Sequence, residues 1–145
     1  MKKAGLLLVV CILLVLTACG NKTDNQKEDT LDKPIVVDNL KMNVKAMDTA
    51  EKVSDKKKQT LYTFTVSGEN VSSSKKGLGS IDFILKTEDG KEVKIDDSLA
   101  TFGDEIEPGK SIEGKVYFSL GEGQKASKLI YKPADKELAE WDVSK

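Results

Sequence analysis

The chain has 145 residues, and its 23 Lys and Arg residues nearly balance its 24 Asp and Glu residues. Every positive side chain is Lys, because the sequence contains no Arg and no His. This composition argues against a nucleic-acid-binding face, which is basic and usually uses Arg, and it removes the commonest general base and metal ligand from any catalytic scheme.

The first 20 residues have the organisation of an export signal. Lys2 and Lys3 precede an apolar run from Leu6 to Leu16, which is shorter than the roughly 20 apolar residues that span a bilayer. The run ends in Leu-Thr-Ala-Cys-Gly, which resembles the lipobox of bacterial lipoproteins. The resemblance implies cleavage before Cys19 and a diacylglyceryl thioether on that residue, whose two acyl chains would hold the chain at a membrane. An ordinary secretory signal and an uncleaved anchor are the alternatives.

The next segment is predicted to be a flexible tether. Residues 20–32 contain one large apolar side chain, Leu31, so they bury too little surface to offset the entropy of ordering. We therefore divide the chain into a signal peptide at 1–18, a lipidated Cys and tether at 19–34, and one folded domain at 35–145. Cys11 lies in the discarded segment, so the domain has no thiol for disulfide or redox chemistry.

In the predicted domain the spacing of apolar residues is that of β-strands, and no stretch shows a sustained helical period. Strands are expected where apolar and polar residues alternate, and loops where Lys, Ser and Gly accumulate. In chain order the first half is predicted to form a strand at 40–46 with Ala46 inward, a polar loop at 48–59, a strand at 60–66 and a surface loop at 70–79.

The second half continues this pattern. Asp89-Gly90 separates two alternating runs and is a strong hairpin signal, while Pro108-Gly109 and residues 121–123 mark further turns. Phe102 falls in a polar loop. Strands are expected at 81–85, 93–95, 112–118, 129–131 and 141–143. About seven short strands at this spacing predict an all-β, antiparallel β-sandwich.

Several of these segments match a known family. The matching residues are Phe83, Leu85, Asp89–Lys91, Pro108, Gly109, Gly114–Val116, Phe118, Leu129 and Tyr131–Pro133. They resemble the domain-of-unknown-function 4352 family, common in Gram-positive lipoproteins. The resemblance implies an immunoglobulin-like sandwich on the extracytoplasmic side of the membrane, but no activity. The sequence departs from the family at Ser67–Glu69, where a bulge or slipped register is expected.

Acidic residues are the candidates for a metal site. Asp96, Asp97, Asp104 and Glu105, with Glu107 nearby, could supply the oxygens that calcium needs. Their spacing is not that of an EF-hand loop, and a solvated loop is the alternative. A carboxylate pair for sugar hydrolysis would also require a cleft. We therefore predict no metal and no cofactor.

Other motifs have structural interpretations beside functional ones. Ser72–Ser74 have no His to activate them, so a nucleophilic Ser would need Lys75 or Lys76. Lys56–Lys58 suit a solvated loop or a contact with anionic lipid or wall polymer. The aromatic residues predicted to be core, and not a sugar-stacking platform, are Tyr62, Phe64, Phe83, Phe118, Tyr131 and Trp141.

The sequence thus favours a lipid-anchored, non-catalytic binding module that recognises a protein, peptide or cell-wall component through loops or an edge strand. Nucleic acid is not an expected partner. The alternative function is a metal- or carboxylate-dependent enzyme of the cell surface, which would need a concave site with perturbed carboxylates.

Overall fold

The computed structural model describes residues 31–144. The predicted signal peptide and Cys19 lie outside the described residues, as does the predicted tether up to residue 30. The described part of the chain forms ten strands in three antiparallel sheets, with two short 3₁₀ turns and no α-helix. It contains no helix long and apolar enough to cross a membrane.

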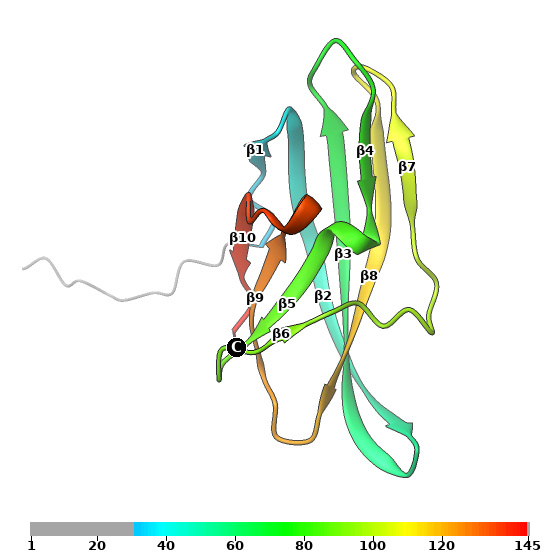
Figure 1. Ribbon diagram of the computed structural model, residues 1–145, viewed down its shortest axis with the longest axis vertical. Coiled ribbons are helices and arrows are strands. Elements are labelled where there is room, and N and C mark those ends of the chain that lie inside the picture. Colours follow the sequence, from blue (N-terminus) through cyan, green and yellow to red (C-terminus); the bar gives the residue numbers. More distant parts are fainter. Residues whose placement is uncertain (1–30, 145) are drawn as a thin grey trace, which may run out of the picture.

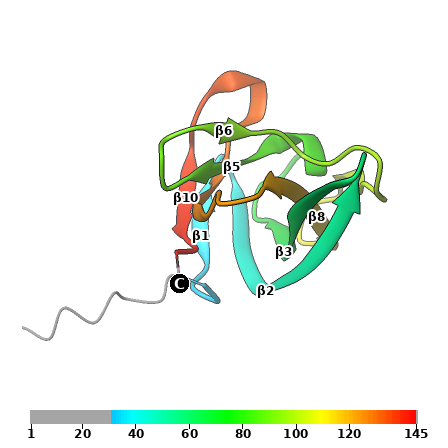
Figure 2. The same ribbon diagram turned by 90° about the horizontal axis from the view of Figure 1, so that it is seen from below.

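Two four-stranded sheets form the layers of a sandwich (Figures 1 and 2). The first has the order β1-β2-β3-β8 and the second β10-β9-β5-β6, while β4 and β7 form a separate pair. The bounds are β1 Ile35–Val37, β2 Leu40–Ser54, β3 Lys57–Asn70, β4 Lys76–Gly79, β5 Phe83–Thr87, β6 Glu92–Val93, β7 Gly103–Ile106, β8 Ser111–Gly121, β9 Ala126–Tyr131 and β10 Ala139–Asp142. The all-β immunoglobulin-like sandwich is confirmed, with more strands than expected.

The inward faces of the two layers form one hydrophobic core. The rings of Phe64 on β3 and Phe118 on β8 meet edge to face with centroids 5.9 Å apart. Five of the six predicted core aromatics are buried, and Tyr62 is half-buried. Every buried hydrophobic residue of the described part lies between Leu40 and Val143. A chain that starts at residue 20 therefore contains the whole of this core.

The prediction of a loop at 48–59 is wrong, because β2 and β3 form a long two-stranded β-ribbon there. β2 continues to Ser54, and β3 begins after a two-residue turn. Asp55 and Lys56 form that turn with φ of 50° and 62°, the left-handed geometry of tight hairpins. The pairing of β3 with β8 begins only at Gln59. At its tip the ribbon meets water on both faces, so no apolar alternation marks its strands.

A bulge occurs in β2 and not at the predicted place. The sequence predicts the irregularity at Ser67–Glu69, but β3 pairs regularly there on both sides. The register shifts instead between Val44 and Ala46, so Lys45 is the extra residue of a bulge. Because the bulge changes which residues face inward, Ala46 is exposed, contrary to its predicted inward position, and Met47 packs against the core.

Other strand boundaries also differ from those predicted. Ile81 is 79% exposed in the 3₁₀ turn η1 (Ser80–Asp82), and the strand begins only at Phe83. The loop predicted at 70–79 contains β4, and β6 ends before Ile95. The physical reason is shared: short edge strands and turns have too few buried residues to produce a clear alternation in the sequence.

The predicted glycine turns are confirmed, and a further glycine has a packing role. Gly90 has φ of 83° between β5 and β6, and Gly109 has φ of 73° between β7 and β8. Gly114 is different, because a Cβ there would lie 2.2 Å from Cγ of Phe102. The glycine that follows Pro108-Gly109 in the family pattern therefore makes room for the Phe102 ring.

Candidate functional site

The four acidic candidates do not form one site. Asp96 accepts hydrogen bonds from Lys52 Nζ and Ser119 Oγ, both at 2.5 Å, whereas Asp97 is exposed. Asp104 and Glu105 lie on β7. Within residues 31–144 no three side chains of His, Cys, Asp or Glu come close enough to hold a metal ion together.

Asp96 is a structural anion that fixes the chain between β6 and β7 to the outer face of the first sheet. Its backbone N–H also donates to the carbonyl of Tyr117 at 2.7 Å. The hydrogen bond from the Lys52 ammonium, followed by those from the Ser119 and Ser98 hydroxyls, holds the pKa of the Asp96 carboxyl well below its usual range. The contacts of Asp96 are therefore those of a partly buried ion pair.

This ion pair gives a testable pH dependence. The folded pKa of Asp96 lies below its unfolded value of about 3.9, so its contribution is complete above that pH and declines as the pH falls toward the folded pKa. We expect Asp96→Asn to lower the free energy of unfolding by about 1–2 kcal/mol at pH 7. Urea unfolding should show this deficit shrinking below about pH 4. A deficit that does not change with pH would contradict this assignment, and Asp97→Asn is the exposed control.

The serine cluster is also structural. Ser72 Oγ donates to Asn70 Oδ1 at 2.7 Å, and Asn70 Nδ2 donates to the carbonyls of Ser74 and Ile106 at 2.7 and 2.8 Å. The nearby lysines have acidic partners, because Lys75 pairs with Glu107 at 2.9 Å and Lys76 with Asp38 at 3.2 Å. The cluster therefore holds the ends of β3 and β7 together.

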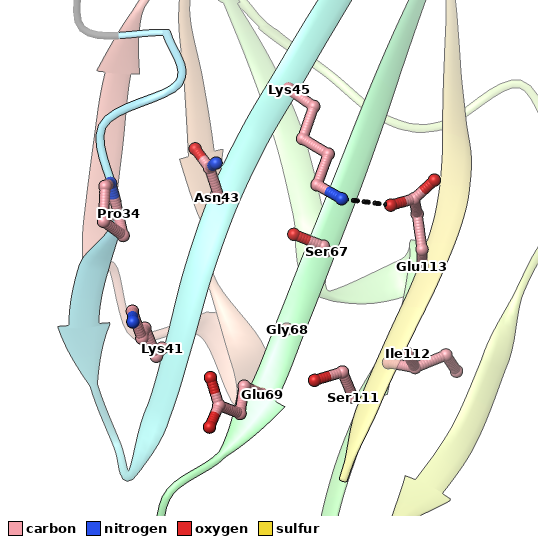
Figure 3. Close-up of a pocket in the computed structure, with 10 residues that line it drawn as sticks. All are labelled: Pro34, Lys41, Asn43, Lys45, Ser67, Gly68, Glu69, Ser111, Ile112 and Glu113. Atoms are coloured by element: carbon pink, nitrogen blue, oxygen red, sulfur yellow. Dashed lines mark hydrogen bonds and ion pairs between the residues drawn. The ribbon is translucent and has the colours of Figure 1, made fainter.

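The outer face of the first sheet carries a polar hollow of about 400 Å³ (Figure 3). Cross-strand pairing arranges its floor in two rows over β2, β3 and β8. One row is Lys41, Glu69 and Ser111, and the other is Asn43, Ser67 and Glu113. We call this surface the polar hollow; its lining is Pro34, Lys41, Asn43, Lys45, Ser67, Gly68, Glu69, Ser111, Ile112 and Glu113.

The bulge in β2 shapes one end of the polar hollow. Lys45, the extra residue, reaches across β3 and pairs with Glu113 at 2.6 Å (Figure 3). Asn43 Nδ2 donates to Asp32 Oδ1 at 2.8 Å, while Asn43 Oδ1 is shielded from solvent and accepts no hydrogen bond among the described residues. The irregular residue of β2 therefore supplies a cation to the site.

The remaining polar groups of the polar hollow are available to a partner. Within the described part of the chain, no side-chain hydrogen bond or ion pair engages Lys41, Ser67, Glu69 or Ser111. They supply donors and acceptors on strands, which hold side chains more rigidly than loops do. Residues two apart on a strand are separated by roughly 7 Å on one face. This spacing suits an extended ligand with regularly placed polar groups.

Sequence reasoning did not single out the residues of the polar hollow. The polar face of the strand around Lys41 and Asn43 is visible in the alternation. What the sequence does not show is that this face lies beside Ser67 and Glu113, because that requires the register between strands far apart in the chain.

Two of the other concavities among the described residues have linings unlike that of the polar hollow. One of about 570 Å³ borders β5 and β6 and contains Ile81, Ile84 and Ile95, with Lys132 paired to Glu92 at 3.1 Å on its rim. The other, about 250 Å³, lies where the ribbon of β2 and β3 diverges from the second layer, beside Met47, Tyr62 and Val143. The first depends on turns and connecting segments, and the second is small, so neither presents polar groups as regularly as the polar hollow.

Known proteins share this fold. Residues 30–138 match DUF4352, a domain of unknown function, and no curated protein matches the chain in sequence. The putative lipoprotein ycdA of Bacillus subtilis is similar with a TM-score of 0.60 and 20% identity over 78% of this chain and 38% of ycdA. The secreted protein MPT63 of Mycobacterium tuberculosis is similar with a TM-score of 0.58 and 17% identity, over 71% of this chain and 82% of MPT63.

The yjhA protein of Bacillus subtilis is also similar, with a TM-score of 0.56 and 15% identity over 74% of this chain and 82% of yjhA. At these identities the likeness shows the β-sandwich fold alone. The chain covers well under half of ycdA, 38% of its length, so the rest of that protein has no counterpart in the match.

Proposed function

The chain belongs to the DUF4352 family of domains of unknown function, and we propose that it is a lipid-anchored lipoprotein with a non-catalytic binding domain on the extracytoplasmic face of the membrane. The lipobox-like Leu-Thr-Ala-Cys-Gly supports the anchor. The similarity in fold to a putative lipoprotein and to a secreted protein supports the location. The domain needs no cofactor in this proposal.

One observation carries the binding function. The polar hollow presents four side chains that have no partner in the described chain, on strands of one rigid sheet. A protein, peptide or cell-wall glycan with alternating donors and acceptors would satisfy them. The anchor would keep this surface close to the envelope, where such partners are concentrated.

The anchor is tested at Cys19. Cys19→Ala removes the thiol that the acyl chains require, so we expect an unprocessed precursor or protein released from the membrane. Fractionation and mass spectrometry of the mature chain measure both. A membrane-retained, fully processed Cys19→Ala chain would contradict the proposal.

The binding surface is tested at Ser67, in the middle of the polar hollow. Ser67→Arg places a long cation there without entering the core, because Ser67 faces outward on β3. We expect the chain of residues 20–145 to capture soluble peptidoglycan fragments or envelope proteins from an envelope extract, and Ser67→Arg to lose at least tenfold in affinity for the captured component.

Thr63→Arg is the matched control, on the same strand and face but outside the polar hollow. It should bind like the unmodified chain. Equal loss for both variants would show that binding does not use the polar hollow, and turnover of a captured glycan or peptide would contradict a non-catalytic function.

A further inference from the structure

Among residues 31–144, no strand pairs with the outer edge of β2 over residues 45–54. β1 covers only the start of β2, at Leu40–Met42, and the N–H of Asp32 donates to the carbonyl of Val44 at 2.8 Å. Beyond Val44, no backbone hydrogen bond between described residues reaches this edge, although the other edge pairs with β3 up to Ser54. Figure 2 shows β2 on the outside of the ribbon.

Such an edge can accept another strand. Residues 31–34, which lead into β1, do not continue the pairing beyond Val44, because Asp32 has φ of 63° and therefore interrupts the extended backbone that strand pairing requires. The sequence of the edge indicates that a second copy of the same strand fits it.

The edge is complementary to itself in one antiparallel register. Opposite residues of an antiparallel pair either both point their N–H and C=O groups at each other or both point them away. Two copies of one strand therefore pair only about an axis that passes through a residue. With the axis at Ala50, Asp48 lies opposite the partner's Lys52 and Met47 opposite the partner's Val53, and the two-fold symmetry repeats both pairs.

Neighbouring registers lack this complementarity. An axis at Thr49 would place Met47 opposite the partner's Glu51 and Lys45 opposite the partner's Val53. An axis at Glu51 would place the Glu51 carboxylates of the two copies opposite each other, and their like charges would repel. Only the Ala50 register combines opposite charges with matched apolar residues.

The faces of the strand agree with this register. Met47 pairs with the buried Phe64 of β3 and so shares its inward face, and Val53, six residues on, lies on the same face. Val53 is 71% exposed in the single chain. Lys52 lies on the outward face and donates to its own Asp96 at 2.5 Å and to Ser119 Oγ at 3.4 Å. To pair with the partner's Asp48, its side chain would turn from these groups toward the edge of β2.

From the free edge, its exposed Val53 and this charge pattern, we infer that two copies of the chain associate through β2, antiparallel, with Ala50 at the two-fold axis. The first sheets of both copies then form one continuous sheet. This association does not require the lipid anchor, although confinement to a membrane would strengthen a short, weak contact.

Cysteine cross-linking tests the register on residues 20–145, which contain the whole described core and no native Cys. In an antiparallel pair, opposite Cα atoms lie roughly 4.5–5.5 Å apart, within disulfide range. Ala50→Cys should therefore form a disulfide dimer in air. In this register residue 49 lies opposite the partner's residue 51, so a Cys at either position is diagonal to its own copy, at roughly 7–8 Å. Thr49→Cys and Glu51→Cys should therefore cross-link much less.

The exposed variant Asp104→Cys, on β7, measures cross-linking by random collision. Ala50→Cys dimers no more abundant than those of Asp104→Cys, or stronger cross-linking at position 49 or 51, would overturn the proposal.

Sedimentation velocity over a concentration series tests the association without a new thiol. In the Asp48→Lys dimer, the new Lys of each copy lies opposite the partner's Lys52, which gives two pairs of like charges. We therefore expect the dissociation constant of this dimer to rise roughly tenfold or more. Asp104→Lys makes the same change in charge away from β2 and should sediment like the unmodified chain. An unmodified chain that stays monomeric at every concentration would overturn the inference. So would a dimer whose affinity falls equally with Asp48→Lys and with Asp104→Lys.

Discussion

Replacing Phe118 with Ala is expected to lower the free energy of unfolding by about 3–5 kcal/mol. Phe118 is fully buried, and its ring packs on Phe64 with an interplanar angle of 71°. Truncation would remove that contact and leave a cavity between the two layers. Since a domain has roughly 5–15 kcal/mol of stability in total, urea unfolding should show a large loss of native protein under mild conditions.

The control for this prediction lies on the same strand. Lys115 is exposed on the opposite face of β8 and pairs across the sheet with Thr65. Lys115→Ala and Thr65→Ala should change the unfolding free energy by less than about 0.5 kcal/mol. If the three substitutions cost the same, the assignment of inward and outward faces would be wrong.

Asn70→Ala is expected to cost about 2–4 kcal/mol, measured by urea unfolding. Asn70 is fully buried, and its side chain makes four hydrogen bonds: its Nδ2 donates to two backbone carbonyls, and its Oδ1 accepts from the N–H and the hydroxyl of Ser72. Alanine would leave the Ile106 carbonyl and the Ser72 groups without these partners.

Ser72→Ala separates the two halves of this network. It removes the Ser72 hydroxyl but keeps both Asn70 Nδ2 donations, so it should cost clearly less than Asn70→Ala. An Asn70→Ala effect no larger than that of Ser72→Ala would show that the donations to Ser74 and Ile106 contribute little.

Strands with one face against the core and the other in solvent could be predicted from the sequence. Tyr62, Phe64 and Val66 face inward from β3, and Val116 and Phe118 from β8, as their alternation indicates. Gly90 and Gly109 mark their turns because each adopts a positive φ that most side chains disfavour.

The remaining features depend on contacts between distant residues. The tip of the ribbon is solvated on both faces, so its residues alternate in no apolar pattern and suggest a loop. The bulge at Lys45 is set by the register between β2 and β3. The polar hollow needs β3 and β8 side by side, with Ser67 opposite Glu113, and no local pattern encodes that pairing.

We propose that the polar hollow is the binding surface of this domain. The most direct test of this claim is amide chemical-shift mapping of residues 20–145 during titration with the envelope component that the unmodified chain captures. We expect the shifts to concentrate at residues 41–45, 67–69 and 111–113. Shifts confined to the loops at 71–75 and 94–102, with none in these three strand segments, would contradict the claim.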